Sequence, residues 1–474
     1  MSGTKCRCYV DLYAAHSEVT GSNFLLVIKL PDGQQVKGIV DCGVFQEKEW
    51  ESNNTKLLYD PKTVDFVLVT HAHADHVGRL PLLVKEGYQG KIFCTEDTAS
   101  ILPHALFDSC KVLGTRYKRN NMPSIYEEQH VSQTLTMLES KPINETFEVH
   151  DNVRVTMLPN GHIQGACMIL IQILDYQEGY INLLFTGDYN DKNTFFDVLP
   201  IPQWVRNLPV TIITESTYGD TDEQPEKCFE KNVYEATQKG FSVLIPAFSL
   251  GRVQEVLYML KCMQDEGKLS TKITVHLDGT LAVKYTQLYK NGVMNISPEM
   301  KDFLPQNFHF VGKVNREEYA SHGGQKIIVT TSGMGTYGPA QSYIPYYLGR
   351  ERALIHFTGY CAEGTYGRKL KDAKENEFIF SGDGGGILAL KKAKVEFTAE
   401  LSAHAKAGTL IKLLKKFKNT KSILINHGEA ETKIAFAKRV YSELDCKKVA
   451  IINREEGLRI GEYGIIKPLN TDLK

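Results

Sequence analysis

The stretch THAHADHVGRL, at positions 70–80, carries three histidines and one aspartate within six positions. Imidazole nitrogens and carboxylate oxygens are ligands that zinc prefers in enzymes. His71 and His73 are two residues apart, so in an extended loop their side chains point to the same side. Asp75 and His76 are adjacent and cannot share that direction. The spacing therefore predicts half of one metal site and half of a second site beside it.

The residues that would complete both sites stand where other apolar runs end. They are His162 in LPNGHIQGA, Asp188 in FTGDYN and His427 in LINHGEAE. Each alone is more typical of a turn than of a ligand, and without them the cluster at 71–76 would be only a polar loop rich in histidine. We expect Asp188 to bridge the two metals, because a carboxylate has two oxygens. Asp41 in IVDCGVF either accepts a hydrogen bond from a ligating histidine or forms a turn.

Short apolar runs predict the strands that position these side chains. They include VDFVLV before THAHADH, INLLF before TGDYN, VTIIT before ESTYGD and SILI before NHGEAE. Buried strands of α/β and α+β proteins have this appearance, and functional loops follow their carboxyl ends. Leu410, Leu413, Leu414 and Phe417 follow a helical period with lysines between them, which predicts an amphipathic helix.

The composition is that of an ordinary globular protein, with 474 residues, 42% hydrophobic and 23% charged residues, and a net charge of −1. This length allows on the order of two or three domains. The near-neutral charge excludes binding of nucleic acid through bulk positive charge. Ten cysteines without a zinc-finger or disulfide spacing favour a reducing compartment. No apolar run is long enough for a signal peptide or a membrane span, so we expect a cytoplasmic protein with no membrane partner.

The order of the candidate ligands resembles that of the metallo-β-lactamase superfamily. TESTYGD with Glu215, ELSAHA with His404 and INHGE with His427 are similar to motifs A, B and C of its β-CASP branch, whose members are nucleases. IPAFSLGRVQE, TTSGMGTYGPAQ and TGYCAEGTYGRKL are also similar to stretches of that branch. The resemblance extends over nearly the whole chain.

The implied fold is of class α/β (α+β), an αββα metallo-β-lactamase sandwich interrupted by an α/β β-CASP domain. Residues 1–208 are rich in predicted strands and are expected to form the N-terminal part of the sandwich. Predicted strands and helices alternate over 209–395, the expected β-CASP domain. Loops that carry histidine return over 396–474, where we expect the sandwich to resume.

A histidine in motif C is typical of RNA-processing members of the branch, so His427 favours RNA over DNA. The resemblance implies a zinc-dependent ribonuclease in which two Zn²⁺ ions hold a hydroxide that attacks the phosphodiester. The same ligand types also bind Mn²⁺. His404 would donate a proton to the leaving oxygen while Glu215 holds its ring. Asp75, Glu215 and His404 are the expected catalytic residues, and endonuclease activity is favoured over 5′-exonuclease activity.

Two departures from the family pattern bear on this expectation. Lys406 stands where the family commonly has an acidic residue, and its charge would oppose the imidazolium of His404 and lower the pKa of that ring. Asn160 replaces the small residue that usually precedes GH. Both departures affect efficiency or substrate preference and remove no predicted ligand.

The expected partner is single-stranded RNA, which basic side chains would bind through its phosphates. Arg252 and Arg368 stand inside family-like stretches, and we predict that they contact RNA. Two other functions stay open. A non-catalytic RNA-binding subunit would differ in metal content, and a small-molecule metallo-hydrolase of the same superfamily would differ in substrate. The sequence also leaves self-association into a homo-oligomer open.

Overall fold

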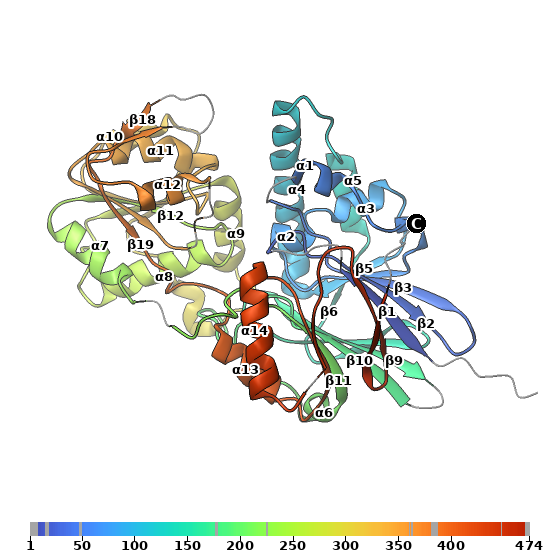
Figure 1. Cartoon of the computed structure of the whole chain (residues 1–474). Helices are drawn as coiled ribbons and strands as arrows, with labels where there is room; N and C mark the ends of the chain where they lie inside the picture. The colour runs from blue at the N-terminus through green and yellow to red at the C-terminus, as the bar shows by residue number, and fades with distance from the viewer. Residues whose placement is uncertain are drawn as a thin grey trace, which may run out of the picture. The chain divides into compact units, whose positions relative to one another are not determined.

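The structure is a computed structural model that describes residues 8–14, 19–46, 50–175, 179–223, 226–359, 361, 364–380, 387–446 and 448–469. By packing, the chain divides into two compact units (Figure 1). The first unit contains Met1–Asp222 and His404–Lys474, and the second contains Glu223–Ala403. The second unit is therefore an insertion in the chain of the first.

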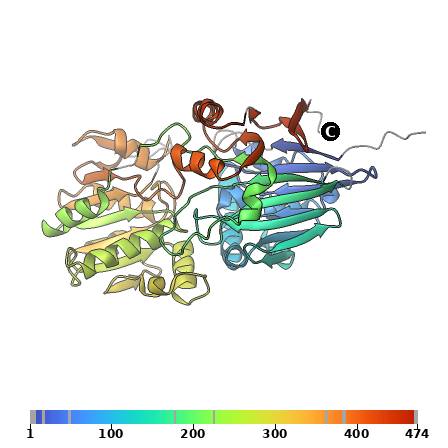
Figure 2. The ribbon, with the colours of Figure 1, turned by 90° about the horizontal axis from the view of Figure 1, so that it is seen from below.

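Two sheets make up the centre of the first unit (Figure 2). The eight-stranded sheet has the spatial order β23 (Gly464–Leu469), β22 (Gly457–Gly461), β1 (Tyr9–Ala14), β2 (Phe24–Lys29), β3 (Gln35–Val40), β4 (Phe66–Leu68), β5 (Lys91–Thr95) and β6 (Leu138–Lys141). The seven-stranded sheet has the order β21 (Val449–Ile451), β20 (Asn419–Ile425), β11 (Pro209–Thr214), β10 (Gly179–Phe185), β9 (Cys167–Asp175), β8 (Val153–Pro159) and β7 (Thr146–His150).

Alternation of apolar side chains explains why the sheets stack. In β9, Ile169 and Ile171 pack into the core that both sheets share. Met168 and Leu170 of the same strand point the other way, into a second apolar cluster. Successive side chains of a strand alternate between its two faces. A strand that is apolar on both faces must be covered on both, so helices are needed outside the sheet.

Helices supply that outer cover and complete an αββα sandwich. The predicted amphipathic helix is confirmed as α13, and its Leu410 and Leu413 join the outer cluster of the seven-stranded sheet with Phe436 of α14. Helix α4 packs against β5 and β6 of the other sheet. The helices of this unit are α1 (Trp50–Thr55), α2 (Ala74–Val77), α3 (Leu80–Lys85), α4 (Glu96–Arg119), α5 (Glu128–Thr136), α6 (Gln203–Asn207), α13 (Ala407–Lys415) and α14 (Ala430–Glu443), with the 3-10 helix Pro61–Thr63.

The second unit is built on a parallel sheet with the order β14 (Phe308–Phe310), β13 (Thr274–Asp278), β15 (Lys326–Thr330), β12 (Ser242–Pro246), β16 (Ala353–Phe357) and β19 (Lys394–Phe397). Strands β17 (Phe378–Phe380) and β18 (Ile387–Leu390) form a separate antiparallel pair. Its helices are α7 (Phe229–Gln238), α8 (Arg252–Asp265), α9 (Thr280–Lys290), α10 (Arg316–Ser321), α11 (Gly338–Leu348) and α12 (Tyr366–Asp372), with the 3-10 helix Pro298–Asp302. Among the described residues, no helix is both long and apolar enough to cross a membrane.

The packing boundaries lie later in the chain than the domain boundaries predicted at 208/209 and 395/396. The predicted strands VTIIT and SILI are confirmed as parts of β11 and β20, and they pair with each other in the sandwich. Residues directly after 208 therefore belong to the first unit. Strand β19 pairs with β16, which keeps the chain in the second unit past residue 395. Pairing between strands distant in the chain sets these limits.

Ile171→Ala tests the shared core of the sandwich. Ile171 is fully buried at the centre of β9, and we expect the truncation to lower the free energy of unfolding by about 2–5 kcal/mol. Urea unfolding followed by tryptophan fluorescence reports on this unit, because the chain's two tryptophans, Trp50 and Trp204, both lie in it. The control is Val112→Ala on the exposed side of α4, which should change stability by less than about 0.5 kcal/mol. Equal effects of the two substitutions would contradict this packing.

Candidate metal centre

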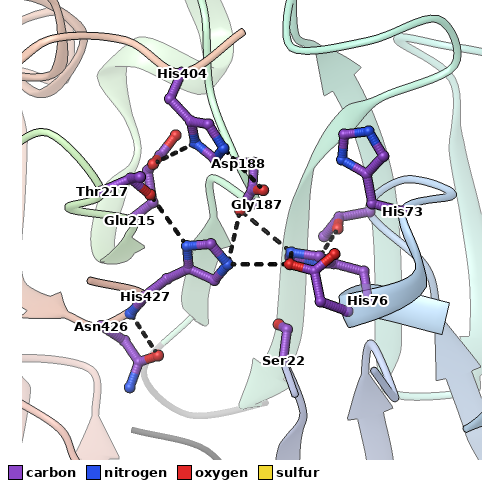
Figure 3. Close-up of polar contacts among 12 residues, drawn as sticks. Ser22, His73, His76, Gly187, Asp188, Glu215, Thr217, His404, Asn426 and His427 are labelled. Atoms are coloured by element: carbon purple, nitrogen blue, oxygen red, sulfur yellow. Dashed lines mark hydrogen bonds and ion pairs between the residues drawn. The ribbon is translucent and has the colours of Figure 1, made fainter. Parts of the chain in front are cut away.

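The predicted site residues of the first unit all stand in loops or helix starts that follow strands. The segment after β4 carries His71 and His73, and its Asp75 and His76 lie in the short helix α2. Four other positions follow strands of the seven-stranded sheet: His162 between β8 and β9, Asp188 after β10, Glu215 after β11 and His427 after β20. His404 lies just before α13. The fold thus brings the ends of strands from both sheets to one place (Figure 3).

Three imidazoles and one carboxylate form the first cluster. His73 Nδ1 lies 3.2 Å from His71 Nε2 and 3.2 Å from His162 Nε2. Asp188 Oδ2 lies 3.7 Å from His71 Nε2 and 3.6 Å from His162 Nε2. Burial lowers the pKa of His71 well below its usual value and also lowers that of His73, so both rings are neutral. Neutral imidazoles offer the lone pairs that a metal ion needs.

Asp188 extends into a second cluster through its other oxygen. Its Oδ1 lies 3.3 Å from both His76 Nε2 and His427 Nε2. Asp75 Oδ2 is 3.9 Å from His76 Nε2 and 4.0 Å from His427 Nε2. Burial alone would raise the pKa of Asp188, but His427, His76 and His404 lower it well below its usual value. The carboxylate that belongs to both clusters is therefore ionised, which is the form in which a carboxylate binds a metal ion.

These clusters fit divalent metal ions. The four donor atoms of each cluster lie within 4.8 Å of one another. Within the part of the chain that the structure describes, His76 Nε2 and Asp188 Oδ1 are buried and lie 3.3 Å apart, but neither atom has a partner with hydrogen-bond geometry. Leaving such atoms unsatisfied costs stability, and a coordinated cation would remove that cost. Histidine and carboxylate ligands with an ionised bridge are a donor set that zinc and manganese both accept.

Asp41 holds one of the histidines in place. It has a left-handed backbone with φ of 59°, which an aspartate tolerates better than most residues. Its Oδ2 lies 2.8 Å from His76 Nδ1, and its two oxygens also accept from the backbone N–H and the hydroxyl of Thr70 at 2.8 Å each. With Nδ1 engaged by Asp41, Nε2 of His76 faces the second cluster. These contacts favour the hydrogen-bonding role predicted for Asp41 over that of a simple turn residue.

His404 and Glu215 form a pair at the edge of both clusters. Glu215 Oε2 lies 2.9 Å from His404 Nδ1, and Asp188 Oδ2 lies 3.7 Å from His404 Nε2. Burial alone would lower the pKa of His404, but Glu215 and Asp188 raise it to about 9. The net shift of this pKa is upward, and a lowering contribution from Lys406 stays a prediction. The ammonium of Lys406 lies over the ring of Tyr218, 3.5 Å from its centroid.

Several contacts that position these residues were missed from sequence. Thr217 Oγ1 lies 3.2 Å from His427 Nδ1, and Asn426 Oδ1 accepts from the backbone N–H of His427 at 2.7 Å. Asn160, identified only as a departure from the family pattern, ties two ligand loops together. Its Oδ1 accepts from His162 N at 2.9 Å, and its Nδ2 donates to Asp188 O at 2.7 Å. Each of the three lies one or two positions from a predicted site residue, and this was the available signal.

The two arginines predicted to bind RNA lie in the second unit. Arg252 is 8% exposed, donates to the carbonyl of Thr358 and has its Nε 3.3 Å from Glu255. Arg368 is at the surface of α12, where its Nε donates to Asp372 Oδ2 at 2.8 Å. Both guanidinium groups are thus engaged within their own unit. Contact with RNA stays a prediction for each of them.

Comparison with known protein families gives three matches. Residues 20–137 match the metallo-beta-lactamase superfamily, residues 253–370 match the Beta-Casp domain, and residues 391–452 match the Zn-dependent metallo-hydrolase RNA specificity domain. The first match contains the 71–76 cluster. The third contains His404 and His427.

Curated relatives match over most of the chain. An RNase J-like protein of Methanocaldococcus jannaschii is 29% identical over 87% of this chain and 91% of its own length. Ribonuclease TTHA0252 of Thermus thermophilus is 29% identical over 90% of this chain and 94% of its own length. The transcription termination factor FttA of Methanosarcina mazei is 29% identical over 88% of this chain and 67% of its own length.

Asp41→Asn tests the support of the second cluster. The substitution keeps the size of the side chain and a residue type that tolerates a positive φ, but it removes the charge that holds His76. We expect the affinity for zinc to fall about 10–100-fold, measured by competition with a chelating dye. Asp32→Asn, in an exposed turn, is the control and should leave zinc affinity unchanged. An unchanged affinity in Asp41→Asn would show that the Asp41–His76 contact does not support metal binding.

Proposed function

Because the chain belongs to the β-CASP branch of the metallo-β-lactamase superfamily, we propose that it is a metal-dependent ribonuclease that hydrolyses phosphodiester bonds of single-stranded RNA. One observation carries the proposal: Asp188 joins two ligand clusters, with the His404–Glu215 pair directly beside them. The named ribonuclease relatives and the match to an RNA specificity domain support RNA as the substrate.

We propose that the resident metals are two Zn²⁺ ions, one in each cluster, with Mn²⁺ as the ion that the same ligands would also accept. When bound, such ions lower the pKa of a water molecule and withdraw charge from the phosphoryl oxygens. His71, His73 and His162 would hold one ion. Asp75, His76 and His427 would hold the other, with Asp188 shared by both.

The chain's own acid completes hydrolysis. As the oxygen of a water molecule bonds to the phosphorus and that water loses a proton, the bond to the leaving ribose oxygen breaks, and the leaving oxygen takes up a proton. We assign this proton to His404, because Glu215 holds Nδ1 and Nε2 lies 3.7 Å from Asp188 Oδ2. The Glu215 carboxylate also favours the imidazolium form of the ring. General acid catalysis of this kind contributes about 10²–10⁴-fold in rate.

The two alternatives are weaker for specific reasons. A non-catalytic RNA-binding subunit would have no use for the seven clustered donor residues. A small-molecule hydrolase of the superfamily would have no use for the Beta-Casp match at 253–370.

We also propose a reducing, cytoplasmic location, since the nine cysteines among the described residues are all free thiols.

The metal content tests the two-cluster arrangement. Purified protein loaded with zinc should bind about two ions per chain, and His71→Ala or His427→Ala should each reduce this to about one, because each removes a ligand from a different cluster. Mass spectrometry of the metal provides the count. His322→Ala, an exposed histidine of the second unit, is the control and should keep about two ions. A wild-type content of one ion would overturn the two-metal proposal.

Products from 5′-labelled single-stranded RNA on a sequencing gel test the activity and its acid. Internal fragments should vanish with Asp75→Ala and fall about 10²–10⁴-fold with His404→Ala. The loss of hydrolysis rate with His404→Ala should be much smaller on bis(p-nitrophenyl) phosphate, because its leaving group needs no proton.

Three results would change the proposal. An equal loss on both substrates would overturn the role of His404 as the acid. A labelled mononucleotide would mean a 5′-exonuclease. No cleavage by the fully metallated protein would overturn the ribonuclease in favour of the RNA-binding subunit or the small-molecule hydrolase.

A further inference from the structure

Lys406 lies on an aromatic ring next to the proposed acid. Its Nζ is 3.5 Å from the centroid of the Tyr218 ring. That ring stands edge-on to the ring of His404, with the centroids 6.3 Å apart. The ammonium is therefore no farther from the His404 ring than these two distances combined. A positive charge of the chain therefore lies close to the proposed reaction centre.

The backbone keeps Lys406 and Tyr218 together. The two residues form a parallel β-bridge, and Ala407 N donates to Thr221 O at 3.1 Å. Lys406 is also the residue from which α13 begins. Because the backbone and the ring both restrict the lysine, less conformational entropy is lost when its ammonium binds an anion. Both side chains are half-buried and partly open to a ligand.

The charges of the site indicate which anion the Lys406 ammonium would bind. Asp75, Asp188 and Glu215 make the centre rich in carboxylates. Bound metals would offset this charge at the scissile phosphate, but the neighbouring phosphates of the RNA need cations of the chain. Lys406 adjoins His404, which we place at the leaving oxygen. With His404 acting at the leaving oxygen, a phosphate bound by Lys406 would be on the side of the leaving nucleotide.

On the basis of the proposed ribonuclease function, we propose that Lys406 binds a non-bridging oxygen of the phosphate next to the scissile one, on the side of the leaving nucleotide, and that Tyr218 positions it. An acidic residue at this position would repel that phosphate. Lys406 thus gives this chain a preference for RNA that extends past the leaving nucleotide.

Binding without rapid turnover tests this contact. The zinc-loaded His404→Ala protein is titrated with a fluorescein-labelled single-stranded RNA, and Kd is measured by fluorescence anisotropy over a range of KCl concentrations. Adding Lys406→Met should raise Kd about tenfold and lower the slope of log Kd against log salt by about 0.7, the value for one phosphate of a single strand. Lys406→Arg should keep most of the affinity, which separates loss of charge from loss of folding.

A matched control separates a direct contact from the general effect of charge. Lys416→Met removes the same charge from the far, exposed end of α13 and should leave Kd and the slope unchanged. RNA with a neutral methylphosphonate next to the scissile position on the leaving side should lose about tenfold in affinity for the Lys406 protein. The same RNA should bind Lys406→Met as well as unmodified RNA does.

The outcomes separate this inference from the proposed function. An unchanged Kd and slope in Lys406→Met, or an equal loss in Lys416→Met, would overturn the contact even if the wild-type chain cleaves RNA. Binding through Lys406 by a chain that never cleaves RNA would overturn the ribonuclease and leave the contact standing.

Discussion

Asp188 places an ionised carboxylate between two groups of imidazoles, where its side chain is only 2% exposed to water. Removing a carboxylate from water costs several kcal/mol unless nearby positive charge and hydrogen bonds offset it. The imidazoles around it hold its pKa well below the usual range, which means that protons or metal ions must supply that charge here. The arrangement of the surrounding loops follows from this need.

No single segment of the chain supplies all the side chains that surround the Asp188 carboxylate. The first sheet provides the loop after β4, and the second provides the loops after β8, β10, β11 and β20. Parallel pairing of β11 with β20 sets Thr214 opposite Ile425, and Ser216 N then donates to His427 O at 3.0 Å. The loops of Glu215 and His427 therefore lie side by side. Thr217 and His427, whose side chains are in contact, are 210 residues apart in the chain. The sandwich thus brings positions that are distant in the chain together in one site.

The sequence was most informative where the candidate ligands are close together in the chain. His71 to His76 were predictable because four potential ligands fall within six positions, and Asp188 and His427 because both follow strongly apolar strands. The strands and the α13 helix were predictable from periodicity. The direction of the Lys406 side chain was not, since it depends on a ring at position 218 that only the fold brings near. The boundaries of the two units could not be predicted from the sequence either, because they depend on which strands pair.

The discontinuity of the first unit has a consequence for how the protein is made. While the ribosome is still adding the second unit, β1 lacks its neighbour β22 and β11 lacks its neighbour β20. Both strands then present open edges, which are sites of misassociation during folding. His404 and His427 have not yet been synthesised at that stage. All four residues of the first ligand cluster are thus already in the nascent chain, whereas the second cluster is complete only after translation of β20 and the loop that follows it.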